Sequence, residues 1–230
     1  MFVSAIVLAA GQGKRFKCRT SKPLVRIGNN SIIKYSLKTL SEIPYVKSII
    51  VVGNRYNLKG VLREVKDFKK VREVVLGGKE RQDSVMNGLK SVENNADLIL
   101  IHDAARPFVS KTDVCLVIKE AKKTGAAILG VPVKATIKEG TRHKVQGRSK
   151  DVVKKTLDRS CLWEIHTPQV FKKEIILEAF KKYARLPVTD DSMLVEKLGK
   201  KVSLVKGSYN NIKITTPEDR RIAKAICHLG

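Results

Sequence analysis

The chain of 230 residues is long enough for one α/β domain with a substantial core, and its net charge of +24 favours an anionic partner such as nucleic acid, an acidic membrane surface or a phosphorylated small molecule. Aromatic residues make up only 5% of the chain, too few for an extended surface on which nucleic-acid bases stack. Four cysteines without paired spacing argue against a zinc site or a disulfide framework, and because no apolar run approaches the ~20 residues that span a bilayer, we expect a cytoplasmic protein.

Short runs of strand-forming residues alternate with segments of helical period in the first part of the chain. We predict strands at 4–9, 46–53, 71–76, 97–103 and 126–133, with helices at 31–42, 61–68, 84–92 and 110–125 between them. Thr112 is the predicted N-cap of the last of these helices, and Gly125 follows its end. Because strands that alternate with helices form right-handed crossovers, the pattern predicts a mostly parallel sheet flanked by helices.

A different pattern follows at about residues 134–158, where polar and apolar residues alternate around Gly140 and Gly147 without a helical face. It predicts a protruding β-arm, polar on both sides and suited to meet something other than its own core. The α/β pattern then returns in the segments 172–184, 190–199, 202–207 and 211–215. A last helix is predicted to begin at Pro217, capped by Thr216. The expected fold is therefore a single Rossmann-like α/β domain over residues 1–230 with a β-arm.

The stretch LAAGQGKRF at residues 8–16 ends the first predicted strand in two glycines and a run of cations. Gly11 and Gly13 let backbone N–H groups approach phosphate oxygens, and the cations that follow can neutralise the charge. These cations are Lys14, Arg15, Lys17, Arg19 and Lys22. Two known phosphate motifs are not met, since Arg15 stands where the Walker motif needs Ser or Thr and Phe16 where the dinucleotide fingerprint needs glycine. A purely structural turn would explain the glycines but not the cations, so we predict a phosphate-binding loop.

Two further segments carry polar side chains at expected loop positions. The strand at 97–103 ends with His102 and Asp103, and Arg106 lies in the loop that follows. Open α/β sheets bind ligands at this carboxyl end of their strands. A carboxylate near a guanidinium suits a phosphorylated, hydroxylated substrate or a metal ion, although a salt-bridged loop corner would have the same sequence. The second segment, GGKERQDSV at 77–85, offers either an anion or ribose contact or a capped helix entry.

An ordered set of blocks runs along the chain: AAGQGKRF, SKPL, GGKERQDSV, HDAARP, PVKATI, LDR, TPQVF, TDDSMLVE and NIKITTPED. On these blocks the chain resembles the 2-C-methyl-D-erythritol 4-phosphate cytidylyltransferase family over essentially its whole length. The resemblance implies a nucleotidyltransferase fold and attack by a substrate phosphate oxygen on the α-phosphorus of CTP, which expels pyrophosphate. It also implies Mg²⁺ bound by the triphosphate and a homodimer in which the β-arm reaches the neighbouring subunit.

The same resemblance implies roles for single residues. The positions that match catalytic residues of the family are Arg15, Lys22, Arg159 and Lys213. Those that match nucleotide-binding residues are Ala9, Ala10, Gly11, Gly13, Gly78 and Ser84. Those that match substrate-binding residues are Asp103, Ala104, Arg106, Thr136 and Thr167. Thr136 and Arg159 match the two roots of the arm, and Asp103 is the expected protein carboxylate near Mg²⁺.

Two segments depart from the family pattern, and two other functions remain open. Ser21 and Pro23 flank Lys22 where the family usually has proline and glutamine, and Asn210 stands where aspartate is common, which weakens any metal contact from there. The open functions are a cytidylyltransferase for another polyol phosphate, such as ribitol 5-phosphate, and a basic nucleic-acid-binding protein on the same fold. We expect neither nucleic acid nor a membrane as partner, because most cations are spaced like a solvated helix face.

Overall fold

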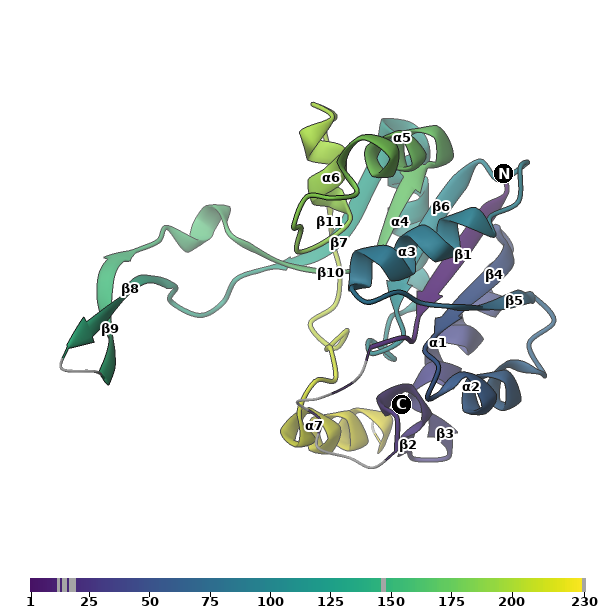
Figure 1. Cartoon of the computed structure of the whole chain (residues 1–230), viewed down its shortest axis with the longest axis horizontal. Helices are drawn as coiled ribbons and strands as arrows, with labels where there is room; N and C mark the ends of the chain where they lie inside the picture. Colours follow the sequence, from purple (N-terminus) through teal and green to yellow (C-terminus); the bar gives the residue numbers. More distant parts are fainter. Residues whose placement is uncertain (12, 14–15, 17–19, 146–147, 229–230) are drawn as a thin grey trace.

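An open sheet of seven strands runs through the computed structural model of the chain, which describes residues 1–11, 13, 16, 20–145 and 148–228 (Figure 1). Its strands lie in the order β11, β7, β10, β6, β1, β4, β5. They span Val3–Leu8 (β1), Val46–Gly53 (β4), Val71–Leu76 (β5), Leu98–Asp103 (β6), Ala126–Pro132 (β7), Trp163–Lys172 (β10) and Ser203–Lys206 (β11). Neighbours pair in parallel except at β10, which is antiparallel to β6 and β7. The predicted mostly parallel, Rossmann-like α/β sheet is confirmed.

Helices cover both faces of this sheet (Figure 1). They span Ile32–Ser41 (α1), Leu58–Val65 (α2), Arg81–Lys90 (α3), Lys111–Thr124 (α4), Lys173–Tyr183 (α5), Ser192–Lys197 (α6) and Pro217–His228 (α7). Side chains of α1, α2 and α4 share one apolar core with the sheet, and those of α3, α5 and α6 share another. Strand β1 serves both cores, since Ala5 and Val7 belong to the first and Ile6 to the second.

A small third core holds the C-terminal helix beside a two-stranded ribbon made of β2 (Arg26–Ile27) and β3 (Asn30–Ser31). The segment 211–215, which follows the α/β pattern in the sequence, forms no strand. Instead the N–H of Ile214 donates to the carbonyl of Ala105, at 2.8 Å. This bond places the segment along the loop that follows β6.

The N-cap of α4 is Ser110, and the prediction of Thr112 was wrong. The Ser110 backbone is extended, and its Oγ accepts a hydrogen bond from the N–H of Asp113 at 3.0 Å. Thr112 lies one residue inside the helix, where its backbone is already helical and cannot serve as a cap. Gly125 ends the helix at φ 94°, in the left-handed region that favours glycine, as predicted.

Four other elements can be compared with the sequence predictions. Helices α2 and α3 each begin three residues before the apolar periodicity does, at Leu58 and Arg81. Strand β10 was not predicted as a strand, although part of it was recognised as the block TPQVF. The last helix begins at Pro217 as predicted, with Thr216 Oγ1 accepting from the N–H of Asp219 at 3.3 Å.

A long antiparallel hairpin extends away from the sheet and confirms the predicted β-arm (Figure 1). Its strands are β8 (Lys138–Val145) and β9 (Arg148–Thr156), and a short helix, η3 (Arg159–Cys161), follows on the return to β10. In the described part of the chain the hairpin forms a two-stranded sheet of its own, separate from the central sheet.

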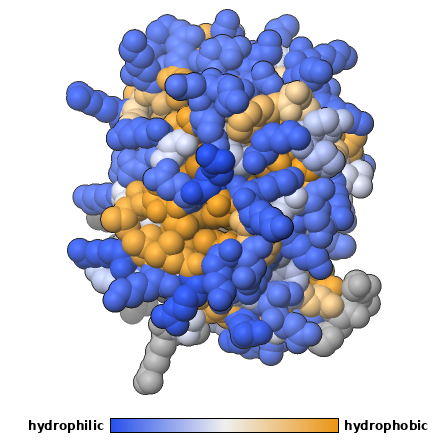
Figure 2. All heavy atoms as spheres, turned by 90° about the vertical axis from the view of Figure 1, so that its right-hand side faces the viewer, coloured by the Kyte–Doolittle hydropathy of each residue, from blue (hydrophilic) through white to orange (hydrophobic). Residues whose placement is uncertain are grey.

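The surface on the side of the edge strand β5 carries a patch of apolar side chains framed by hydrophilic ones (Figure 2). Exposed leucines on β5 and α2 include Leu76 and Leu62. Among the helices of the described residues, none combines the length and the apolar character needed to cross a membrane.

Candidate active site

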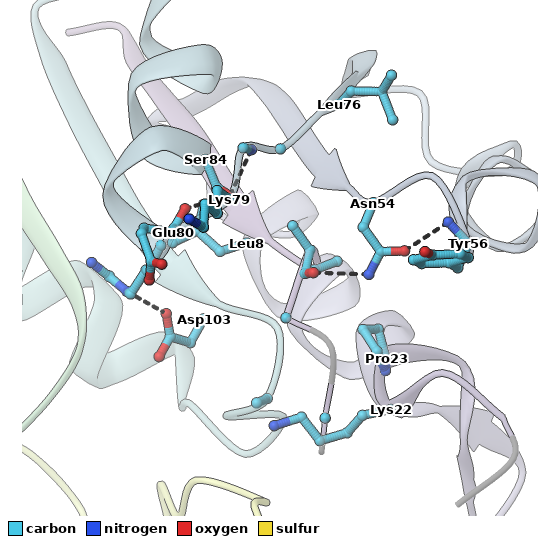
Figure 3. Close-up of a pocket in the computed structure, with 18 of the residues that line it drawn as sticks. Leu8, Lys22, Pro23, Asn54, Tyr56, Leu76, Lys79, Glu80, Ser84 and Asp103 are labelled. Atoms are coloured by element: carbon cyan, nitrogen blue, oxygen red, sulfur yellow. Dashed lines mark hydrogen bonds and ion pairs between the residues drawn. The ribbon is translucent and has the colours of Figure 1, made fainter.

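A cavity of about 700 Å³ opens at the carboxyl ends of β1, β4 and β6 (Figure 3). This is the edge of an open α/β sheet at which ligands bind. The cavity brings together many of the residues that the sequence pointed to, namely Ala9, Ala10, Gly11, Gly13, Lys22, Gly78, Ser84, Asp103 and Lys213. The predicted nucleotide-binding residues therefore lie around one space. Arg15 falls outside the described residues.

The loop after β1 depends on glycine at two places. Gly13 has φ 63°, in the left-handed region that side chains disfavour. Directly beside this loop, a Cβ on Gly77 would come within 2.6 Å of both Ala10 Cβ and Ser84 Oγ, so only glycine allows this close approach. Around Gly11, by contrast, a Cβ would meet no atom of the described residues within 4 Å.

Helix α3 enters the site through a capping box. The side chain of Glu80 accepts from the backbone N–H of Asp83, and the Asp83 carboxylate accepts from the N–H of Glu80 at 2.9 Å. One turn on, Ser84 Oγ accepts from the N–H of Gly78 at 3.2 Å and donates to the carbonyl of Glu80. Ser84 thus fixes the glycine loop against the helix. This agrees both with an anion or ribose contact and with a capped helix entry, the two interpretations of the sequence.

Four charged side chains form a network at the end of β6. Asp103 accepts from Lys213 Nζ at 2.6 Å and from Arg81 Nε at 3.4 Å. Arg81 also forms a two-pronged pair with Asp191, at 2.9 and 2.8 Å, and Asp191 is only 1% exposed. Burial alone would raise the pKa of Asp103, but the charges of Arg81 and Lys213 hold it well below its usual range. The site therefore keeps an ionised carboxylate between two cations.

Asp191 was not assigned a role from the sequence, and Arg81 was considered only as an anion or ribose contact before the helix, not as an ion-pair partner. Both stood inside recognised blocks, RQDSV and TDDS, but the partner of each lies 110 residues away. A charged residue in an otherwise ordinary loop gives no sign of such a partner. Only the fold, which sets the N-terminus of α3 beside that of α6, brings them together.

Three of the residues predicted to bind substrate do not line the cavity that the described residues form. Arg106 is buried and donates to the carbonyls of Asn211 at 2.8 Å and Ile165 at 3.1 Å. Ala104 is fully buried. Thr167 Oγ1 accepts from the N–H of Asp103 at 3.0 Å. In this chain alone these residues hold the β6 loop, and their contact with substrate stays a prediction.

The two predicted residues at the roots of the arm are exposed and lie outside this cavity. Arg159 Nη1 donates to the carbonyl of Lys134 at 2.6 Å, which ties together the two chain segments that lead into and out of the arm. Thr136 lies between Lys134 and β8. A single chain therefore does not bring Thr136 or Arg159 to its own site.

His102, next to Asp103, is fully buried and neutral. The carbonyl of Arg106 can only accept, so His102 Nε2 donates to it at 3.1 Å, and Nδ1 accepts from Thr167 Oγ1 at 3.1 Å. Burial lowers the pKa of His102 from 6.5 to about 4. His102 therefore serves as a fixed link between the β6 loop and β10.

This burial predicts a pH dependence of stability. The unfolded chain binds a proton at His102 near pH 6.5 but the folded chain does not until about pH 4, so stability is lost as the pH falls through this window. From about pH 7.5 to about pH 5, the free energy of unfolding is expected to drop by about 2 kcal/mol through this group. Urea unfolding at both pH values, compared with His102→Gln, measures this; the same drop in both proteins would contradict it.

The cavity offers few carboxylates for a metal ion. Glu80 caps α3 and Asp103 is paired with two cations. In the described part of the chain, no group of three or more His, Cys, Asp or Glu side chains could hold an ion. The donor set fits Mg²⁺ only as an ion bound mainly by ligand phosphates, with at most Asp103 added from the protein.

A glycine loop and two lysines line the cavity, and solved structures place this α/β protein among the nucleotidyltransferases. The chain superposes on 4-diphosphocytidyl-2C-methyl-D-erythritol synthase of Anaerococcus prevotii with a TM-score of 0.84 and 32% identity, covering 99% of this chain and 96% of that one. For the 2-C-methyl-D-erythritol 4-phosphate cytidylyltransferase of Thermus thermophilus the TM-score is 0.80 at 28% identity, covering 99% and 100%.

The sequence narrows the class to one family. The model of the family described as IspD, 2-C-methyl-D-erythritol 4-phosphate cytidylyltransferase, matches residues 3–228. A relative of that name from Dictyoglomus thermophilum is 46% identical over 222 residues, covering 94% of this chain and 93% of the relative. Another, from Caldanaerobacter subterraneus, is 42% identical and covers 97% and 98%. The chain belongs to the 2-C-methyl-D-erythritol 4-phosphate cytidylyltransferase family.

Proposed function

We propose that the protein transfers the cytidylyl group of CTP to 2-C-methyl-D-erythritol 4-phosphate, giving 4-diphosphocytidyl-2-C-methyl-D-erythritol and pyrophosphate in non-mevalonate isoprenoid biosynthesis. The observation that carries the proposal is the cavity itself: it gathers the glycine loop after β1, the α3 entry and the cations Lys22 and Lys213 at one sheet edge. The family match over residues 3–228 supplies the identity of the two substrates.

The chemistry needs positioning and charge neutralisation. A phosphate oxygen of the acceptor forms a bond to the α-phosphorus of CTP, and the bond from that phosphorus to the bridging oxygen of the β-phosphate breaks, so that pyrophosphate leaves. No side chain has to form a covalent intermediate. Lys22, near the loop that follows β1 (Figure 3), and Lys213, paired with Asp103, both line the cavity and bring two ammonium groups to it. Their role is to stabilise the negative charge that builds up in the transition state.

We propose Mg²⁺ as the metal cofactor. When bound, the ion supplies neutralisation of triphosphate charge and orientation of the leaving group. Asp103 is the protein carboxylate placed to contribute, and its two paired cations keep it ionised. Asn210, which replaces the aspartate common in the family, is exposed and does not line the cavity formed by the described residues, so it adds nothing to this donor set.

We further propose a homodimer in which the β-arm completes the partner's site. The arm leaves the sheet as a polar hairpin, and the two residues at its roots, Thr136 and Arg159, lie outside the cavity of their own chain (Figure 1). A second copy of the chain that received this arm would gain a cation from Arg159 for the acceptor phosphate.

The dimer predicts that a defect at Arg159 appears in the other subunit's site. Arg159→Ala is expected to raise KM for the acceptor phosphate about tenfold or more, with KM for CTP little changed, because only one substrate loses its cation. Mixed dimers of this variant with Lys22→Ala subunits test the sharing, since one of their two sites then combines an intact arm with an intact loop. At an acceptor concentration well below KM, such mixtures should recover activity up to that of one intact site; activity no higher than that of either parent would contradict sharing.

Incubation with CTP, Mg²⁺ and each candidate acceptor tests the function directly. Release of pyrophosphate with 2-C-methyl-D-erythritol 4-phosphate is the expected result. Turnover with ribitol 5-phosphate alone would move the substrate assignment to the other polyol phosphate. No CTP binding, together with an affinity for nucleic acid that falls steeply with salt, would favour the basic nucleic-acid-binding alternative.

A further inference from the structure

The turn between β4 and α2 touches the nucleotide loop with two asparagine amides. Asn54 Nδ2 donates to the carbonyl of Ala10 at 2.8 Å, and Asn57 Nδ2 donates to the carbonyl of Ala9 at 2.9 Å. Asn54 lines the cavity, whereas Asn57 is only 1% exposed (Figure 3). Neither asparagine belongs to the blocks on which the family resemblance rests.

The two amides are themselves held rigidly. Asn57 Oδ1 accepts from the N–H of Asn54 at 2.8 Å, and Asn54 Oδ1 accepts from the N–H groups of Tyr56 and Asn57 at 2.9 and 3.0 Å. The second amide hydrogen of Asn57 goes to Ser21 Oγ at 3.0 Å, one residue before Lys22. Because the carbonyl oxygens and amide groups lock each other, neither side chain can turn without breaking several hydrogen bonds.

This arrangement fixes the direction of two backbone N–H groups. In a trans peptide the carbonyl of one residue and the N–H of the next point in opposite directions. Because the asparagine amides of the turn bind the carbonyls of Ala9 and Ala10, the N–H groups of Ala10 and Gly11 point away from the turn. Asn54 lies on one side of the strand end and Ser84 and Asp103 on the other, so N–H groups directed away from Asn54 point to the side of the cavity that Ser84 and Asp103 line (Figure 3). Within the described residues, neither N–H has a hydrogen-bond partner.

We infer that Asn54 and Asn57 are positioning residues, whose amides aim the N–H groups of Ala10 and Gly11 at bound CTP. The inference rests on the proposed use of CTP and adds how this chain orients its nucleotide loop. Orienting the donors before binding lowers the cost of ordering them when the anion arrives. In this chain the same turn also anchors Ser21, at a position where the resemblance leads to proline.

The test is the dissociation constant of CTP for Asn54→Ser and Asn54→Asp, measured by calorimetric titration. Both replacements keep an oxygen that can accept from the N–H groups of Tyr56 and Asn57, and both lose the amide donor to Ala10. If the neutral Asn54→Ser variant and the charged Asn54→Asp variant weaken CTP binding equally, the effect comes from the lost amide donor and not from the added charge. We expect the dissociation constant to rise about tenfold or more in both, the equivalent of one charge-assisted hydrogen bond.

Asn87→Ser is the matched control. Asn87 Nδ2 also donates to a backbone carbonyl near the cavity, that of Leu76 at 3.0 Å, but the following N–H, of Gly77, already donates to the carbonyl of Gly53 at 2.7 Å. No N–H is aimed at the ligand there, so the dissociation constant should change less than about twofold. Equal CTP affinity in the wild type and both Asn54 variants overturns the inference, as does an equal weakening in Asn87→Ser.

A second measurement does not depend on the variants folding. In isotope-labelled wild-type protein, the amide resonances of Ala10 and Gly11 should shift when CTP is added. Unmoved resonances in a protein that binds CTP would overturn the inference while leaving the proposed function intact. Failure of the wild type to bind CTP would instead contradict the proposed function.

Discussion

Replacing Lys22 with alanine is expected to lower kcat about a hundredfold to a thousandfold, the range seen when one charge-stabilising donor is removed from an active site. Lys22 lines the cavity beside the β1 loop, where the phosphates of CTP would lie (Figure 3). Its neutralising charge matters most in the transition state, so kcat should fall far more than KM for CTP rises. Steady-state kinetics with saturating acceptor measure both.

Lys79→Ala is the matched control for this prediction. Lys79 also lines the cavity, on the exposed loop before α3, and its loss removes the same charge. A general electrostatic effect would lower kcat equally in both variants. We expect less than a tenfold loss for Lys79→Ala, and stability changes of no more than about 1 kcal/mol in either protein. Comparable kcat losses, or retention of most of kcat in Lys22→Ala, would contradict a specific role for Lys22.

Replacing Arg81 with methionine is expected to destabilise the fold by about 3 kcal/mol, as measured by urea unfolding. The change leaves the buried carboxylate of Asp191 without the cation that pairs with both of its oxygens. This loss of unfolding free energy is at the lower end of the range for a broken buried ion pair, because the Arg81 side chain is still 32% exposed. Asp103 keeps Lys213, so the stability defect should arise chiefly at Asp191.

The pH dependence of stability and a double variant test whether the stability defect arises at Asp191. Burial is the larger influence on the pKa of Asp191 and raises it, and without Arg81 the pKa should rise further. A folded-state pKa above the unfolded value means that stability falls as the pH rises, so Arg81→Met should lose more stability at about pH 8 than at about pH 5. Adding Asp191→Leu should restore much of the loss, because both charges are then gone. A double variant no more stable than Arg81→Met would contradict the account.

The central fold could be predicted because its signals are local. Strands buried on both faces appear as continuous apolar runs, and Gly125 and Pro217 mark helix ends by their backbone chemistry alone. The β-arm was visible as a loss of helical period. Strand β10 was harder, because its block was recognised as a motif but its antiparallel place between β6 and β7 depends on residues far along the chain.

The site was predictable where side chains or glycines act close to one strand end, as in the loop after β1. It was not predictable where residues act through distant partners. Arg81 meets Asp191 across 110 positions, and Asn54 meets Ala10 across 44. Arg106, a predicted substrate-binding residue, holds two backbone carbonyls in the interior of this chain, and its contact with substrate stays a prediction. Sequence spacing cannot distinguish such a support from a ligand contact.

A crystal structure of the protein soaked with CTP and Mg²⁺ would show whether this cavity is the nucleotide site. We expect triphosphate density in the cavity between the Ala9–Gly11 backbone and Lys22, with the nucleoside toward Gly78 and Ser84. An empty cavity at saturating CTP, or a nucleotide bound elsewhere on the molecule, would contradict it.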